Sequence, residues 1–173
     1  MELKDVVKNI LEKAYALLPA KMNTKAATAM LLAIGLQESK FLHRQQVITV
    51  TRDGKKVNVP EGPAVSFWQF EAGGGVKGVM QYYSTREHCK ALCTHFGVAF
   101  DQKAIWEAMK TNDVLGACMA RLLLFTDPLA LPLPTPAQED TAWRLYSRVW
   151  RPGKPHPATW PANWAAAIKE VAE

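Results

Sequence analysis

The chain has 173 residues, of which 49% are hydrophobic and 21% charged, an ordinary balance for one globular domain with a real core. Its formal net charge is +5 and its pI is about 9.2, so nucleic acid, an acidic membrane or bacterial cell wall would each suit its surface. No apolar run is long enough to cross a membrane, which excludes membrane insertion. The amphipathic start of the chain does not resemble a signal peptide, so we expect the protein to stay in the cytoplasm until something releases it.

The three cysteines, Cys89, Cys93 and Cys118, fall in apolar stripes of predicted helices. An odd number of cysteines gives no disulfide framework, so we expect small core residues. A zinc site that adds His88 and His95 to the first two cysteines is the alternative, but the spacing matches no zinc pattern. The sequence therefore implies neither a metal nor an organic cofactor.

The first predicted elements are two helices and a hairpin. Residues 3–18 place their apolar side chains on one helical face, and residues 25–39 form a nearly all-apolar helix with Thr24 as its N-cap. Residues 47–59 are rich in β-branched side chains around Asp53-Gly54, which predicts a β-hairpin.

The remainder is predicted to be helical. Gly73-Gly74-Gly75 indicates a tight, close-packed backbone, and it lacks the strand and the Lys-Ser/Thr ending of a phosphate-binding loop. Ser84 and Glu87 form a capping box, and Gly97 is a C-terminal stop. The helices expected here cover residues 85–96, a short segment capped by Asp101, residues 113–126, residues 136–150 and a segment after Pro161.

These elements predict a single domain over residues 1–173 of the α+β class, mainly α. The hairpin forms a small lobe, and a basic loop with a C-terminal helix occupies about residues 151–173.

Glu38 is the first candidate for chemistry, because it lies at the end of the apolar helix. A helix that is apolar nearly all round is normally buried, so this carboxyl leaves bulk water and also faces the negative end of the helix dipole. Both effects favour its protonated form, which is what a general acid needs. The alternative is a solvated residue at a helix end.

Three motifs occur in a specific order along the chain: Leu36-Gln37-Glu38-Ser39-Lys40-Phe41, then Gly62-Pro63-Ala64-Val65-Ser66-Phe67-Trp68-Gln69, then Trp143-Arg144-Leu145-Tyr146-Ser147. They resemble the Glu-Ser, Gly-Ala-x-Gly-Leu-Met-Gln and Tyr-Asn motifs of the lysozyme-like superfamily, closest to soluble lytic transglycosylases, goose-type lysozymes and phage lysis proteins. The resemblance covers roughly residues 24–151. Ser66 and Phe67 replace the usual Gly-Leu, and Ser147 replaces the usual Asn, which affects substrate contacts more than the fold.

The resemblance implies a lysozyme-like fold with a cleft between lobes and Glu38 as the general acid. Glu38 would protonate the β-1,4 bond between N-acetylmuramic acid and N-acetylglucosamine. A lysozyme also needs a second carboxylate, whereas a lytic transglycosylase of this kind uses the 6-hydroxyl of the sugar. Glu71 is the first choice for that carboxylate, because goose-type enzymes often carry an aspartate at this spacing; Glu61 and Asp53 are the alternatives.

Four further residues are candidates for substrate contacts: Gln69, Trp68, Ser39 and Tyr146. Gln69 would bind an N-acetyl group or position Glu38, and the two aromatic rings would border a sugar, as amphipathic rings do. Core packing is the alternative for Trp68, and a local hydrogen bond is the alternative for Ser39. A basic cluster would attract the anionic wall or form a solvated face; it consists of Arg144, Arg148, Arg151 and Lys154.

The expected partner is therefore the peptidoglycan glycan strand, cut by a monomeric enzyme of phage or prophage origin. Such an enzyme reaches the periplasm and cell wall through a holin or within a virion. Alternatives are a non-catalytic wall-binding or virion protein with the same fold, hydrolysis of chitin, and a basic nucleic-acid-binding helical protein. The last lacks a helix-turn-helix signature, so nucleic acid is not the expected partner.

Overall fold

The computed structural model describes residues 1–173. Helices contain 61% of these residues and strands 8%, so the expectation of a mainly helical protein with a small sheet is confirmed. The elements, in chain order, are α1 (Leu3–Val6), α2 (Glu12–Ala16), α3 (Lys25–Ser39), β1 (Ile48–Arg52), β2 (Lys55–Val59), α4 (Lys77–Gln81), α5 (Arg86–Phe96), α6 (Gln102–Met109), α7 (Asp113–Phe125), α8 (Glu139–Trp150) and α9 (Trp160–Ala172). None of these helices combines the length and the apolar character needed to cross a bilayer.

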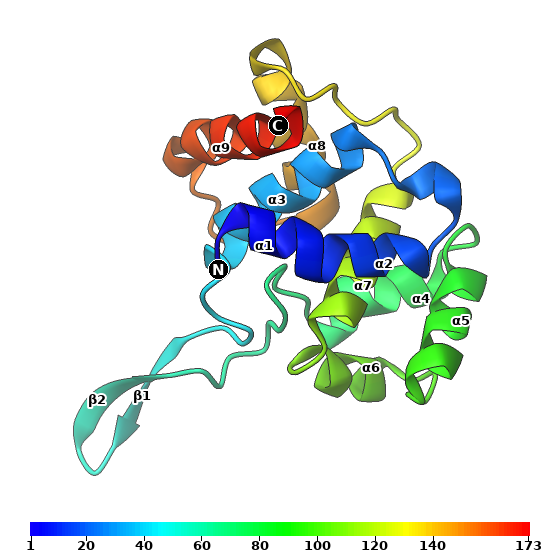
Figure 1. Ribbon diagram of the computed structural model, residues 1–173. Coiled ribbons are helices and arrows are strands. Elements are labelled where there is room, and N and C mark those ends of the chain that lie inside the picture. The colour runs from blue at the N-terminus through cyan, green and yellow to red at the C-terminus, as the bar shows by residue number, and fades with distance from the viewer.

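The helices form two groups around one core. Helix α3 packs against α9, which also contacts α8, while α7 contacts α4, α5 and α6 (Figure 1). Helices α3 and α7 touch each other, and α2 also packs against α7 across one side of both groups. The two groups are thus joined through their two most buried helices.

The first helix runs without a break from Leu3 to Ala16, through a wider π-helical turn at Val7–Leu11 that joins α1 to α2. The predicted helix over residues 3–18 is confirmed, except that its last two residues lie outside it. Val6 and Leu11 are fully buried, which is the amphipathic face that the spacing predicted.

Helix α3 is buried on nearly every side, as its composition predicted. All residues from Ala27 to Gly35 are buried, and the Thr24 hydroxyl accepts the Ala27 amide at 3.0 Å as the N-cap. The helix ends where Lys40 takes a left-handed conformation with φ of 54°. Solvent reaches this helix at its first residues, Lys25 and Ala26, and at its last turn, where Gln37 and Glu38 are half-buried.

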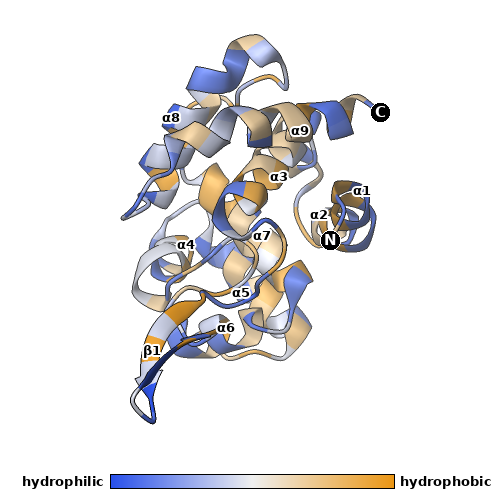
Figure 2. Cartoon of the chain, turned by 90° about the vertical axis from the view of Figure 1, so that its left-hand side faces the viewer, coloured by the Kyte–Doolittle hydropathy of each residue, from blue (hydrophilic) through white to orange (hydrophobic).

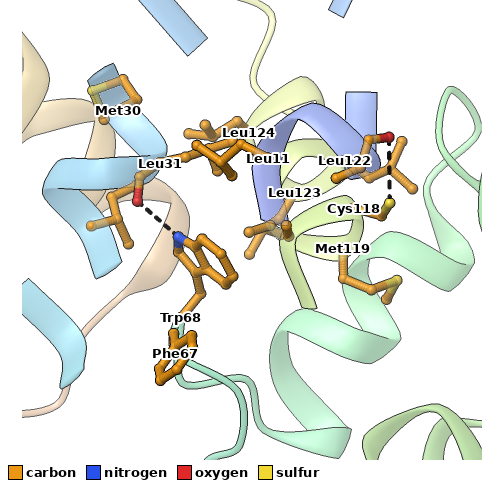
Figure 3. Close-up of a cluster of buried hydrophobic side chains, with 14 of the residues drawn as sticks. Leu11, Met30, Leu31, Phe67, Trp68, Cys118, Met119, Leu122, Leu123 and Leu124 are labelled. Carbon is orange, nitrogen blue, oxygen red and sulfur yellow. Dashed lines mark hydrogen bonds between the residues drawn. The ribbon is translucent and has the colours of Figure 1, made fainter. Parts of the chain in front are cut away.

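The core between the two helix groups contains Trp68, whose indole N–H donates to the Leu31 carbonyl at 2.8 Å (Figure 3). Cys118 lies in the same core and contacts the Ala14 carbonyl. All three cysteines are buried, which confirms the prediction of core residues. Burial raises the pKa of the Cys118 and Cys89 thiols to about 12, so both stay protonated at neutral pH.

The expected capping box at the start of α5 is wrong. The Ser84 hydroxyl has no partner, and the Thr85 hydroxyl donates to the Val79 carbonyl at 2.7 Å instead. This bond ties α5 to α4, a short helix that the sequence did not predict. The other two signals are confirmed: Asp101 accepts the Ala104 amide at 3.0 Å, and Gly97 ends α5 with φ of 65°.

The hairpin has the predicted turn, with Asp53 and Gly54 both at positive φ, as a type I′ turn requires. Its register pairs Val50 with Val57, and Figure 1 shows both strands projecting away from the helical body. One face carries Ile48, Val50, Val57 and Val59, with Arg52 and Lys55 near the tip; Figure 2 shows the apolar base and hydrophilic tip. Neither strand makes an extensive contact with a helix, so the hairpin is an appendage of the domain (Figure 1).

We expect Gly35→Ala to destabilise the fold, although this change usually stabilises a helix by about 1 kcal/mol. The added Cβ would lie 2.1 Å from Cζ of Phe41, whose ring is buried against Phe67 and Trp68 and cannot move freely. Urea denaturation should show a loss of about 1–3 kcal/mol in unfolding free energy. Gly153→Ala is the control, because a Cβ added there would have no atom within 4 Å, and a loss equal to that of Gly35→Ala would contradict the steric argument.

Candidate active-site cleft

A cleft of about 1100 Å³ opens between the two helix groups. One wall comes from the ends of α3 and α8 and from the loop after α8, and the other from the glycine turn before α4, from α4 and from the end of α7. The hairpin base adds Gln46 and Ala64, but neither strand lines the cleft. The expectation of a cleft formed by the hairpin lobe is therefore wrong, because the hairpin points away from the body (Figure 1).

The second wall of the cleft includes a turn of three glycines, which have no side chains, and its backbone lies close to the core. Gly73, Gly74 and Gly75 all line the cleft. A Cβ at Gly75 would lie 2.7 Å from the Phe70 ring, so the backbone there is close-packed as predicted, whereas a Cβ at Gly73 would meet nothing.

Glu38 lies on the cleft wall, in the last turn of α3. Its side chain is half-buried, and its Oε1 accepts a hydrogen bond of 2.6 Å from the Tyr146 hydroxyl. Burial raises the pKa of the Glu38 carboxyl above its usual range, and the Tyr146 bond offsets part of that rise because it favours the ionised form. The carboxyl can therefore hold a proton at a higher pH than an exposed glutamate can.

Tyr146 reaches Glu38 from α8 and is itself only 2% exposed. Its ring stacks on Trp160 of α9, with centroids 5.2 Å apart and planes 10° from parallel. Burial and the nearby Glu38 raise the pKa of the Tyr146 hydroxyl, so this group is a fixed donor. Tyr146 was predicted to border a sugar, but its buried ring offers no face to one, and its hydroxyl contacts Glu38 instead.

Gln69 lines the cleft from a tight loop whose ends are joined by reciprocal backbone bonds between Val65 and Phe70. Gln69 and Ser66 both have positive φ, of 53° and 67°. Non-glycine residues rarely adopt this conformation, which persists only where neighbouring contacts enforce it. The Gln69 side-chain amide donates to the Ser66 carbonyl at 2.8 Å, which leaves its oxygen without a protein partner in the cleft.

Two predicted substrate contacts are wrong. Trp68 has 0% of its surface exposed and lies in the core, so its ring cannot border a sugar (Figure 3). Ser39 is also buried, and its hydroxyl donates to the Phe67 carbonyl at 2.7 Å. Both residues instead hold the loop at 64–70 against α3, which agrees with the simpler alternative for each.

Of the three candidates for a second carboxylate, only Glu71 lines the cleft, where its side chain is exposed. Glu61 pairs with Arg52 at 2.6 Å, and Asp53 forms the hairpin turn. The sequence did not identify Asp127, which also lines the cleft. Its side chain is 5% exposed and bonded to Arg148 at 2.6 Å; this bond keeps the pKa of Asp127 below its usual value, so the carboxylate is ionised and already occupied.

The basic cluster is divided by the structure. Arg148, Arg151 and Lys154 line the cleft, while Arg144 lies outside it. Trp150, which the sequence did not single out, lines the cleft one turn after Tyr146 and donates its indole N–H to the Trp68 carbonyl at 2.8 Å. Its spacing of four residues from Tyr146 places both on one helical face, a signal that could have found it.

The cleft side chains include no group of three or more His, Cys, Asp or Glu residues that could hold a metal ion, and none occurs elsewhere in the chain. Comparison with known protein families, with curated proteins and with solved structures finds no significant match. A function for this cleft must therefore be inferred from its geometry and from the sequence motifs that line it.

Tyr146→Phe should raise the pKa of Glu38 further, because it removes the hydroxyl that stabilises the ionised carboxylate. The measurement is carboxyl ¹³C NMR titration of protein labelled at glutamate, with the Glu38→Gln variant used to assign the resonance. A Glu38 titration that stays in place or moves to lower pH in Tyr146→Phe would show that the hydroxyl does not stabilise the charged form.

Proposed function

We propose that this protein cleaves peptidoglycan glycan strands at the β-1,4 bond between N-acetylmuramic acid and N-acetylglucosamine, with Glu38 as the general acid. The observation that carries the proposal is Glu38 itself: a half-buried carboxyl of raised pKa, on the wall of a large cleft, with a fixed hydroxyl donor on one oxygen. Glycosidic bond cleavage requires such an acid to protonate the leaving oxygen.

The surroundings of Glu38 support this role. The bond from Tyr146 occupies Oε1 and fixes the orientation of the carboxyl, which leaves Oε2 to carry the proton toward a substrate oxygen. Gln69 lines the same cleft, and its amide oxygen has no protein partner, so it can accept a hydrogen bond from an N-acetyl N–H. One residue from each of the three sequence motifs thus lines the cleft: Glu38, Gln69 and Tyr146.

After the leaving oxygen is protonated, the reaction can be completed in two ways. In a lysozyme-like reaction, Glu71 acts as the second carboxylate, since it lines the cleft and forms no salt bridge. In a lytic transglycosylase reaction, the 6-hydroxyl of the sugar attacks the anomeric carbon and leaves an anhydro end, so no second carboxylate is needed. Asp127 suits neither role, because Arg148 already holds its carboxylate.

The test incubates purified protein with peptidoglycan and analyses the released muropeptides by mass spectrometry. We expect cleavage by the wild-type protein and a loss of at least about 100-fold in Glu38→Gln, because the general acid supplies roughly 10²–10⁴-fold. Glu12→Gln is the matched control, since it removes an exposed carboxylate of α2 that lies outside the cleft, and it should keep full activity.

Product mass separates the two mechanisms. Anhydro ends are lighter than reducing ends by the mass of one water. If the products carry anhydro ends, Glu71→Gln should retain activity, because that mechanism needs no second carboxylate. Reducing ends together with an inactive Glu71→Gln would assign the hydrolytic role to Glu71. Absence of products from the wild-type protein, or full activity of Glu38→Gln, would overturn the proposal and favour a wall-binding or virion protein that has the cleft without the activity.

A further inference from the structure

The loop that follows α8 forms one wall of the cleft and carries positive charge. Arg151, Lys154 and His156 of this loop line the cleft. Arg151 and Lys154 form no salt bridge, in contrast to Arg148, which Asp127 neutralises. The wall beside Glu38 therefore presents two cations that no protein carboxylate satisfies.

Gln37, the residue before Glu38, fastens this loop to α3. Its Nε2 donates to the His156 carbonyl at 2.9 Å. Its Oε1 accepts hydrogen bonds from the Thr159 hydroxyl at 3.0 Å and from the Asn163 amide at 2.8 Å. Both ends of one side-chain amide thus hold a segment that is distant in the sequence.

The composition of the loop also restricts it. Pro152, Pro155 and Pro157 each fix one backbone dihedral, and Arg151 starts the loop in a left-handed conformation with φ of 48°. A loop that is restricted by prolines and latched at one end loses less entropy when it binds a ligand than a free loop does. A cluster of charges that only faces solvent needs no such restraint, whereas a loop that binds a ligand benefits from it.

We propose that residues 151–156, positioned by Gln37, bind carboxylate groups carried by the glycan and so select carboxylate-bearing strands over neutral, chitin-like strands. The inference rests on the proposed function, since it assigns a recognition element to the same cleft. Arg151 and Lys154 supply the charge, and an arginine guanidinium matches the geometry of a carboxylate. Gln37 is a positioning residue, because it acts through the loop.

Two sources can supply the carboxylate: the lactyl group of an N-acetylmuramic acid that bears no stem peptide, or the stem peptide itself where it is attached. Binding is therefore measured with three soluble ligands, namely chito-oligosaccharides without carboxylates, peptide-free peptidoglycan fragments with the lactyl group alone, and peptide-bearing fragments. All proteins carry Glu38→Gln, so that no ligand is cleaved during the calorimetric titration.

In this background, Arg151→Gln with Lys154→Gln should weaken binding of the carboxylate-bearing ligands roughly tenfold at low salt and leave chito-oligosaccharide binding unchanged. The preference should shrink as salt is raised, because these charges are exposed and screened. A loss confined to peptide-bearing fragments assigns the contact to the stem peptide. A loss confined to peptide-free fragments assigns it to the lactyl carboxylate, which the stem peptide converts to an uncharged amide. A loss with both shows that the loop binds either carboxylate.

Gln37→Leu should reduce the preference for carboxylate-bearing over neutral ligands although both loop cations remain. If Gln37 only stabilised the fold, its loss would weaken binding of all three ligands alike. Asn163→Ala, which removes one of the latch bonds from outside the cleft, should act in the same direction if Gln37→Leu folds poorly. Arg144→Gln is the matched control: it removes an exposed cation of α8 outside the cleft and should change nothing.

If the wild-type protein cleaves peptidoglycan, equal binding of all three ligands by the Glu38→Gln protein would overturn the loop inference alone. Equal losses for neutral and carboxylate-bearing ligands in the loop variant would do the same. A wild-type protein that neither binds nor cleaves any glycan would overturn the proposed function and this inference together.

Discussion

The burial of helix α3 is the constraint on which the rest of the structure depends. A helix with apolar side chains all round must be covered on every side, so α9 and α7 pack against it and hold the two helix groups together. Its last turn lies at the edge of the core, and three consecutive residues there make different contacts. Gln37 fastens the basic loop, Glu38 faces the cleft, and Ser39 bonds the loop at 64–70. Helix α3 thus fixes the positions of the Glu38 carboxyl and of both neighbouring loops relative to one another.

The raised pKa of Glu38 follows from this position at the end of a buried helix. Desolvation at the end of a buried helix is the larger effect and raises the carboxyl pKa, while one hydrogen bond from Tyr146 acts against it. The hydroxyl is held in turn by stacking of its ring on Trp160 of α9, the helix that covers α3. A single packed layer of helices therefore provides both the low-polarity environment and the donor that orients the acid, without any other charged group bonded to Glu38.

Local signals predicted the parts of the fold that local physics decides. The apolar run and Thr24 gave the bounds of α3, Asp53-Gly54 gave the hairpin turn, and Gly97 gave the end of α5. Ser84 failed as a cap because Thr85 found a partner in α4, a contact that no local pattern encodes. Of the candidate site residues, Glu38, Gln69, Glu71 and Tyr146 line the cleft, whereas Trp68 and Ser39 do not. Whether an aromatic ring or a hydroxyl faces the core or the cleft depends on partners distant in sequence, and the same is true of the bonds made by Gln37 and Asp127.

The hairpin that projects from the body has a consequence for how the molecule opens. A two-stranded sheet alone in water is only marginally stable, and here neither face gains stability from a packed helix. Opening β1 and β2 therefore exposes the half-buried side chains of the hairpin itself and no part of the helical core, so its free energy is largely independent of that of the core. Amide hydrogens of the hairpin should exchange by local fluctuation at a rate that denaturant barely changes, while those of α3 exchange only when the whole domain unfolds. The same independence makes the Asp53-Gly54 turn a site where proteolytic cleavage would leave the helical body folded.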